Sequence, residues 1–86
     1  MSLTAACLVV YASLNQVHRV KRHLYRGGVF VDMVRAPKCL GLRGCSFALR
    51  CDAALVPAIR RASEELGIEI PGVFAESPGG YEVVAP

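Results

Sequence analysis

The order in which strand-like and helix-like patterns alternate along this chain most limits its fold. Four short apolar runs rich in β-branched or aromatic residues are typical of buried strands. Two longer segments repeat apolar residues every three or four positions, as helices that pack one face on a sheet do. The patterns predict strands over 5–12, 29–34, 45–51 and 68–76, and helices over 14–26 and 53–66.

This order predicts an α+β fold. Within one small domain it favours a ferredoxin-like βαββαβ two-layer sandwich, an antiparallel sheet with two helices on one face. The first and third strands would then occupy the centre of the sheet. Pro71 lies inside the fourth run and has no backbone N–H to donate, so that strand is expected at an edge.

Residues that start and stop helices support the two helical segments. Ser13 offers an N-cap for the first helix, and Gly27-Gly28 supplies its stop. Asp52 is an N-cap candidate for the second helix, which ends at Gly67. Pro57 conflicts with a regular first turn, so either that turn is irregular or the regular helix begins near residue 56.

The 86 residues are expected to form a single domain, 1–86, with its core over about 5–76. Residues 77–86 predict a turn followed by either a short C-terminal strand or a loose end. The hydrophobic content of 53% favours a compact fold. The net charge of +3 falls short of a nucleic-acid-binding footprint, and the apolar run 5–12 is too short to span a membrane.

Four cysteines in a short chain raise the question of a disulfide framework. Cys7 and Cys51, however, lie inside strand-like apolar runs, and no convincing secretory signal precedes them. Free thiols in a reducing cytoplasm are therefore expected.

The segment from Lys38 to Arg50 collects the residues that carry chemistry. It joins two cysteines, three basic side chains and two glycines ahead of an apolar strand. A thiol in an electropositive, accessible setting is more easily ionised than one in an apolar core. The reactive thiol is therefore expected at Cys45.

The predicted topology adds a second source of positive potential. An antiparallel third strand would begin where the first strand ends, next to Ser13 and Asn15 at the start of the first helix. Backbone N–H groups and the helix dipole there stabilise an anion. Lys38 and Arg43 in the loop act in the same direction, so these four residues are predicted to stabilise the Cys45 thiolate.

Cys39 lies six positions before Cys45, within reach of a disulfide if the loop folds back. The pair could be an attacking and a resolving thiol, two metal ligands, or two small residues that share a loop. No metal site is predicted, because a C-x-x-C motif is absent and His18 and His23 have no ligand spacing to the thiols. No cofactor is predicted either.

The first helix carries a basic surface. His18 and His23 are interpreted as surface residues rather than catalytic bases. The cations beside them form either a solvated face or a dock for an acidic partner; they are Arg19, Lys21, Arg22 and Arg26. An RNA-binding sheet would need exposed aromatic residues, and Tyr11 and Phe47 are isolated, so no nucleic-acid partner is predicted.

Several segments taken together resemble the family described as selenium/sulfur carrier protein-like. They are Val-Val-Tyr-Ala-Ser at the end of the first run, Arg-Gly-Gly-Val, Val-Arg-Ala-Pro, Gly-Cys-Ser-Phe-Ala-Leu-Arg, and Glu-Leu-Gly-Ile-Glu-Ile-Pro-Gly-Val-Phe. The similarity covers roughly residues 6 to 75. It implies that the family's thiol falls on Cys45 and its strand arginine on Arg50. The chain departs from the pattern at Ser46, in its serine-poor loop and at the displaced Pro57.

The leading hypothesis that follows is a thiol-based sulfur or selenium carrier rather than a true catalyst. Cys45 would hold a persulfide or selenosulfide, Cys39 would be a resolving thiol, and the partners would be donor and acceptor proteins. The alternative is a non-enzymatic binding or regulatory module that acts through its open sheet face or a dimer interface. A soft-metal chaperone ranks last, and a homodimer is left open.

Overall fold

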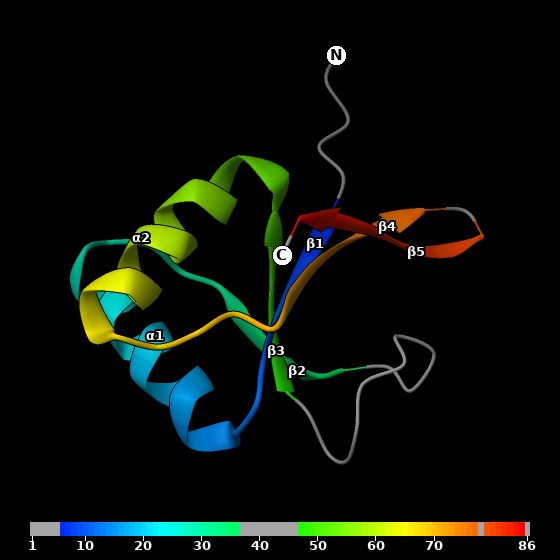
Figure 1. Cartoon of the computed structure of the whole chain (residues 1–86). Helices are drawn as coiled ribbons and strands as arrows, with labels where there is room; N and C mark the ends of the chain where they lie inside the picture. The colour runs from blue at the N-terminus through cyan, green and yellow to red at the C-terminus, as the bar shows by residue number, and fades with distance from the viewer. Residues whose placement is uncertain (1–5, 37–46, 78, 86) are drawn as a thin grey trace.

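The computed structural model describes residues 6–36, 47–77 and 79–85, and Figure 1 shows their order in space. Within these ranges the protein is an α+β fold with five strands and two α-helices. The elements are β1 (Ala6–Tyr11), α1 (Leu14–Arg26), β2 (Asp32–Arg35), β3 (Phe47–Asp52), the short 3₁₀ helix η2 (Ala53–Leu55), α2 (Val56–Leu66), β4 (Gly72–Ser77) and β5 (Gly80–Ala85).

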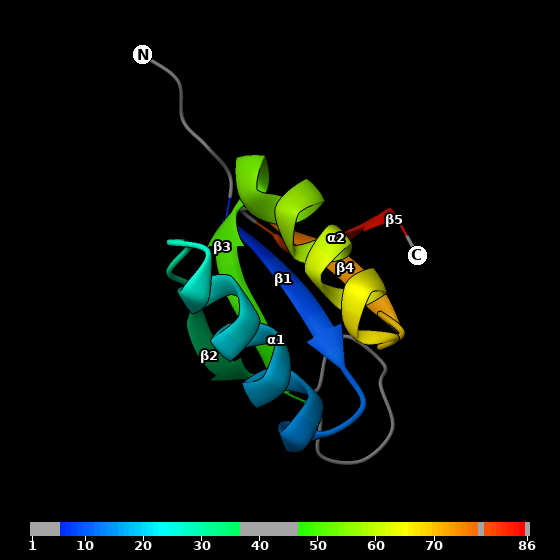
Figure 2. The ribbon, with the colours of Figure 1, turned by 90° about the vertical axis from the view of Figure 1, so that its left-hand side faces the viewer.

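The strands form one sheet in the order β2-β3-β1-β4-β5, and every neighbouring pair is antiparallel. The two helices lie side by side on the same face of this sheet (Figure 2). The α+β class, the antiparallel sheet and the shared helical face are therefore as predicted. The sheet differs from the predicted four-stranded sandwich by the additional strand β5.

The middle strand β1 is buried along most of its length. Its residues from Cys7 to Tyr11 are each at most 2% exposed. Both edges of β1 are paired, and alternate side chains enter two different apolar clusters. Cys7, Val9 and Tyr11 pack under the helices, whereas Leu8 and Val10 lie on the helix-free face. Burial on both faces explains why this strand is a continuous apolar run instead of an alternating one.

Helix α1 begins and ends where the sequence predicts. The backbone N–H of Gln16 donates to Ser13 Oγ at 3.3 Å, which makes Ser13 the N-cap. At the other end, the N–H groups of Gly27 and Val29 donate to the carbonyl of Leu24 at 3.0 and 2.9 Å. Gly28 takes a positive φ of 84° in this turn, a conformation that glycine adopts without steric cost.

The second strand begins later than predicted. Strand β2 starts at Asp32 rather than Val29. The reason is the helix end, because the N–H of Val29 caps α1 and is not available to a neighbouring strand. Phe30 is 70% exposed, and its ring packs edge-on against Tyr25 at 5.1 Å instead of entering the core.

Pro57 lies in the first turn of α2, where its missing N–H would have no intrahelical partner. The chain enters this helix through the 3₁₀ turn η2, so both predicted solutions occur together: an irregular turn and a regular helix from Val56. Asp52 is the N-cap of η2, but its side chain makes no capping hydrogen bond. Gly67 ends α2 with a φ of 70°.

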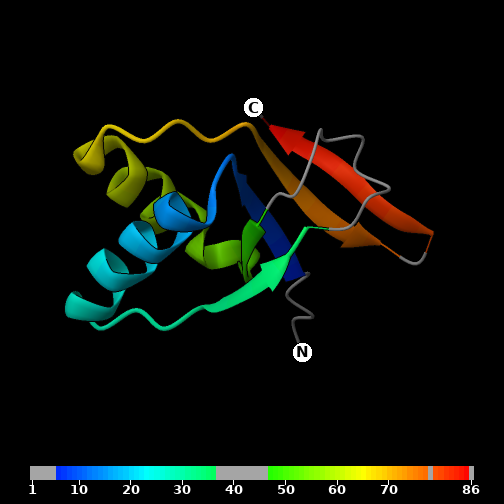
Figure 3. The ribbon, with the colours of Figure 1, turned by 90° about the horizontal axis from the view of Figure 1, so that it is seen from below.

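The predicted edge position of the Pro71 strand is wrong. Strand β4 begins at Gly72, after the proline, so the missing N–H of Pro71 is not needed for pairing. β4 pairs with β1 on one side and with β5 on the other, which makes β5 the edge (Figure 3). The C-terminal segment thus forms a strand rather than a loose end.

The edge strand β5 is less regular than the strands inside the sheet. Its pairing with β4 shifts by one residue between Val73 and Phe74, so Val84 has no direct partner in the ladder. Val83 and Val84 are 71% and 52% exposed. The register shift is a bulge of the kind that increases local twist at sheet edges.

A buried hydroxyl pair joins the middle strand to α2. Tyr11 Oη lies 2.6 Å from Ser63 Oγ, and Ser63 Oγ donates to the carbonyl of Ile59 at 3.0 Å. Because the single proton of Ser63 is used on Ile59, Tyr11 is the donor in the first bond. Burial raises the pKa of the Tyr11 phenol to about 12, which keeps this donor protonated.

This arrangement predicts that the two partners of the hydroxyl pair are unequally sensitive. Ser63→Ala leaves the buried Tyr11 hydroxyl without an acceptor and should lower the free energy of unfolding by about 1–3 kcal/mol. Tyr11→Phe leaves Ser63 bonded to Ile59 and should cost about 1 kcal/mol. Urea unfolding of both variants and of the double variant measures the difference. A larger loss in Tyr11→Phe than in Ser63→Ala would contradict the assignment of the donor.

Candidate functional site

The predicted thiol site is only partly within the described residues. Cys39, Cys45, Arg43 and Lys38 lie outside them, so their predicted roles stay predictions. The described part of the site is the start of α1 with Ser13 and the neighbouring Asn15, together with the first residue of β3, Phe47.

The first turn of α1 adds no charge that opposes the positive end of the helix. Ser13 uses its hydroxyl to cap the N–H of Gln16, so this side chain is committed to the helix. Asn15 is exposed. The first turn contains no acidic residue, so nothing in it offsets the positive end of the helix dipole. An anion near this turn would therefore be stabilised.

The register of the sheet brings the beginning of β3 to the same end of the molecule. Phe47 pairs with Tyr11, and Ser13 follows Tyr11 by two residues. Figure 1 shows the first turn of α1 and the start of β3 at this common end. The register agrees with the predicted antiparallel pairing of the first and third strands, and the position of Cys45 beside the start of the helix stays a prediction.

Arg35 is a cation at this end that the sequence reasoning did not select. It pairs with Phe47 across β2 and β3, and its guanidinium lies 5.9 Å from the centre of the Phe47 ring. The sequence signal that could have identified Arg35 is its position shortly before the basic segment that begins at Lys38. Its closeness to Phe47 depends on the pairing of two strands, which a single sequence does not specify.

Gln16 is a second residue that the sequence reasoning missed. Its amide oxygen Oε1 is buried and has no hydrogen-bond partner among the described residues. A buried acceptor without a donor costs free energy, so such groups usually find a partner. Because Gln16 lies in the first turn of α1, this unsatisfied acceptor is at the same end as Asn15.

The two described cysteines are core residues. Cys7 and Cys51 are free and face each other directly across β1 and β3. Burial is the main reason that the pKa of the Cys51 thiol rises to about 11, and Cys7 and Asp52 add to the effect. Burial and then Glu76 raise the pKa of Cys7. Both thiols are therefore kept protonated, which suppresses their nucleophilicity.

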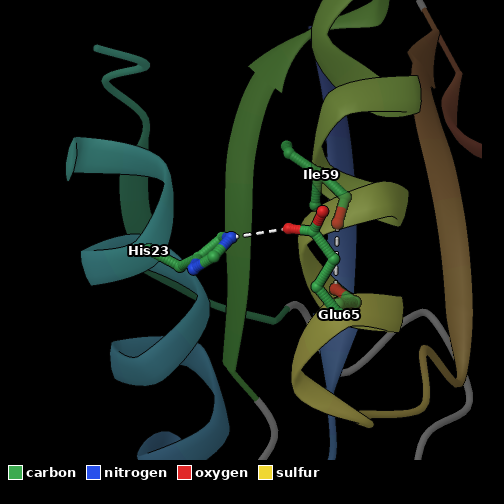
Figure 4. Close-up of polar contacts among 4 residues, drawn as sticks. His23, Ile59 and Glu65 are labelled. Carbon is green, nitrogen blue, oxygen red and sulfur yellow. Dashed lines mark hydrogen bonds and ion pairs between the residues drawn. The ribbon is translucent and has the colours of Figure 1, made fainter. Parts of the chain in front are cut away.

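His23 joins the two helices. Its Nε2 lies 2.8 Å from Oε1 of Glu65, and Figure 4 shows this contact crossing from α1 to α2. The pair borders a groove of about 610 Å³ whose lining also includes the small residues Ala58 and Ala62. His18 is exposed on α1, so both histidines are surface residues as predicted.

The helix-free face of the sheet carries an ion pair over an apolar layer. Arg50 on β3 reaches across β1 to Glu76 on β4, with Nε–Oε2 at 2.8 Å and Nη2–Oε1 at 3.3 Å. The hydrogen bond from Arg50 lowers the pKa of Glu76 below its ordinary value. The residue that the family resemblance marks is thus held by a carboxylate in a fixed direction.

The apolar residues beside this ion pair offer little free surface. Each is at most 8% exposed; they are Leu8, Val10, Ala48 and Phe74. Tyr11 is fully buried on the opposite face, under the helices, and cannot stack on a nucleic-acid base. Docking through the centre of an open sheet face therefore gains no support from these side chains.

No three His, Cys, Asp or Glu residues come together as a metal-holding group within residues 6–36, 47–77 and 79–85. In the same part of the chain, neither α1 nor α2 is long and apolar enough to cross a membrane.

Comparison with known proteins identifies no relative: neither a family model, nor a curated protein, nor a solved structure matches the chain.

The raised thiol pKa values predict that Cys7 and Cys51 are protected from alkylation in the native protein. In the native protein near neutral pH, Cys7 and Cys51 should react with iodoacetamide at least about a hundredfold more slowly than in denaturant, since thiolate is scarce and access is blocked. The rate at Cys51 should rise only as pH climbs toward 11. Peptide mapping by mass spectrometry follows each thiol. Equal native and denatured rates for Cys51 would contradict its burial.

Proposed function

We propose that this protein carries sulfur or selenium on Cys45 as a persulfide or selenosulfide. The observation that supports this most is the pairing of Phe47 with Tyr11 at the end where α1 begins. Cys45 precedes Phe47 by two residues in the chain. A thiol close to an unopposed helix N-terminus has a lowered pKa and reacts as a thiolate.

Loading is an exchange reaction without net oxidation. The Cys45 thiolate attacks the terminal sulfur of a donor persulfide, a new S–S bond forms, and the donor's S–S bond breaks. The electron pair leaves with the donor sulfur as a thiolate. Cys45 then carries the persulfide, whose negative charge Arg43, Lys38 and the helix N-terminus would stabilise. Arg35, which borders Phe47, adds a further positive charge at this end.

Unloading has two routes. An acceptor thiolate can remove the terminal sulfur by the reverse exchange, which regenerates the Cys45 thiolate. Alternatively, the Cys39 thiolate attacks the Cys45 sulfur, a Cys39–Cys45 disulfide forms, and hydrosulfide leaves. The second route leaves a disulfide that an external thiol must reduce before the next cycle.

The proposal also covers the fold family, the cellular compartment and the partners. We propose that the fold is a ferredoxin-like sandwich extended by β5; the central place of β1, its neighbour β3 and the shared helical face support this. The compartment is the cytoplasm, consistent with the free thiols Cys7 and Cys51. The partners are donor and acceptor proteins, not nucleic acid or membrane.

Sulfur loading is tested directly by mass spectrometry after incubation with a cysteine desulfurase and cysteine. Wild type and the core control Cys51→Ala should both gain sulfur mass, and Cys45→Ser should gain none. Cys39→Ser should load normally and keep its sulfur longer, since the resolving route is removed. Equal loading of Cys45→Ser and wild type would end the proposal.

The contribution of the helix N-terminus can be isolated at Ser13. Ser13→Asp keeps a good N-cap but adds a negative charge, so alkylation of Cys45 at neutral pH should slow by about two- to fivefold. Ser13→Asn is the matched control, because it caps the helix without charge. Both are measured in a Cys39→Ser background. Identical rates in the two variants would show that α1 does not act on the thiol.

A further inference from the structure

We propose that the outward face of α1 is a docking surface for an acidic segment of a partner protein. Val17, Val20 and Leu24 turn the opposite side of the helix into the core. The outward side carries Asn15 followed by three arginines at spacings of four, three and four residues, a pattern that forms one straight ridge on a helix. These arginines are Arg19, Arg22 and Arg26, and all three are exposed.

The ridge is a source of unneutralised charge. Helix α1 contains no Asp or Glu, and none of its three ridge arginines forms an ion pair with a described residue. Glu65 on the neighbouring helix is bonded to His23. Guanidinium groups bind carboxylates through two parallel hydrogen bonds, which adds directional selectivity to charge attraction.

An exposed aromatic pair lies beside the ridge. Tyr25 and Phe30 are 65% and 70% exposed, and their rings meet edge to face at 5.1 Å. Tyr25 shares a shallow depression with Lys21 and Arg22. Tyrosine, phenylalanine and arginine are the residues that protein interfaces favour, and aromatic anchors dominate binding energy. The surface therefore offers apolar contact as well as charge.

An acidic protein segment fits this surface better than a nucleic acid. The net charge of the chain is only +3, which falls short of the extended basic surface that a phosphate backbone requires. The edge-to-face arrangement of Tyr25 and Phe30 is not a parallel stacking platform for bases. A helix with carboxylates every three or four residues and one apolar side chain matches both the spacing and the aromatic pair.

The position of the ridge relates it to the proposed chemistry. It starts at Asn15, at the end of the molecule where β3 begins. A partner seated on α1 would approach that end, so the ridge suits a sulfur donor. Only this identification of the partner as a donor rests on the proposed carrier function; the docking surface itself does not.

The test uses a fluorescein-labelled helical peptide with four glutamates in the spacing of the ridge and one leucine. Its counterpart has glutamines in place of the glutamates. Fluorescence anisotropy at low salt should show the glutamate peptide binding at least about tenfold more tightly, and the difference should shrink with added salt. Arg22→Glu should weaken binding by about tenfold, whereas Arg35→Glu, the same charge change on β2, should weaken it less than about threefold.

A second pair of variants tests the aromatic contact. Tyr25→Ser should weaken binding of the glutamate peptide by about fivefold or more, and Val83→Ser, at a similarly exposed apolar site on β5, should leave it unchanged. All four substituted residues are on the surface, and circular dichroism confirms that each variant keeps its secondary structure.

Several results would overturn the inference. The glutamate peptide could fail to bind, or Arg22→Glu and Arg35→Glu could lose equal affinity for it. An RNA oligonucleotide or an anionic vesicle could also bind more tightly than the peptide. Cys45→Ser separates the two proposals, because it should bind the peptide as wild type does and should gain no sulfur. Peptide binding without sulfur loading in wild type would defeat the carrier function alone, and sulfur loading without peptide binding would defeat the docking surface alone.

Discussion

The antiparallel ladder between β1 and β3 is the interaction on which the rest of the structure depends. It sets which side chains of β1 face the helices, and therefore puts the Tyr11 hydroxyl within reach of Ser63. A slip of one residue would turn Cys7, Val9 and Tyr11 to the other face, bring Leu8 and Val10 under the helices instead, and break the bond between Tyr11 and Ser63. The same ladder brings Phe47 to the start of α1, so fold and candidate site share one constraint.

The helices were predictable because their ends are local. Ser13, Gly27 and Gly67 act through bonds to residues a few positions away, and each was found where the sequence predicts. The strands were less so. The late start of β2 follows from the N–H of Val29, which caps α1. The interior position of β4 follows from its pairing with β5, a strand for which the sequence offers only a turn signal and a short apolar segment.

The candidate site also combines residues that the local sequence predicts with residues that only tertiary contacts identify. Ser13 and Asn15 were predictable because they follow from a helix start, whereas Arg35 and Gln16 acquire significance only from tertiary neighbours. Which face Cys7 and Tyr11 would take could not be read from β1, since the whole run is apolar. The residues that would carry the thiol chemistry stand on sequence reasoning, supported by the charge and register of the elements on either side.

Three parts of helix α1, its inner side, its first turn and its outer side, have different roles. Its inner side supplies core packing, its first turn supplies positive potential, and its outer side carries arginines and an aromatic neighbour. The proposed sulfur chemistry would use the first turn, and the proposed docking would use the outer side. Substitutions on the outer side would therefore alter the proposed docking without disturbing the core.

The bulge in β5 has a consequence for behaviour at high concentration. An exposed edge strand with valines at its surface invites a strand from another chain to continue the ladder. Here the regular stretch ends at Val83, because the shift between Val73 and Phe74 takes Val84 out of register. Only a short ladder can be added before the geometry fails, so the bulge opposes indefinite growth of the sheet into fibrils.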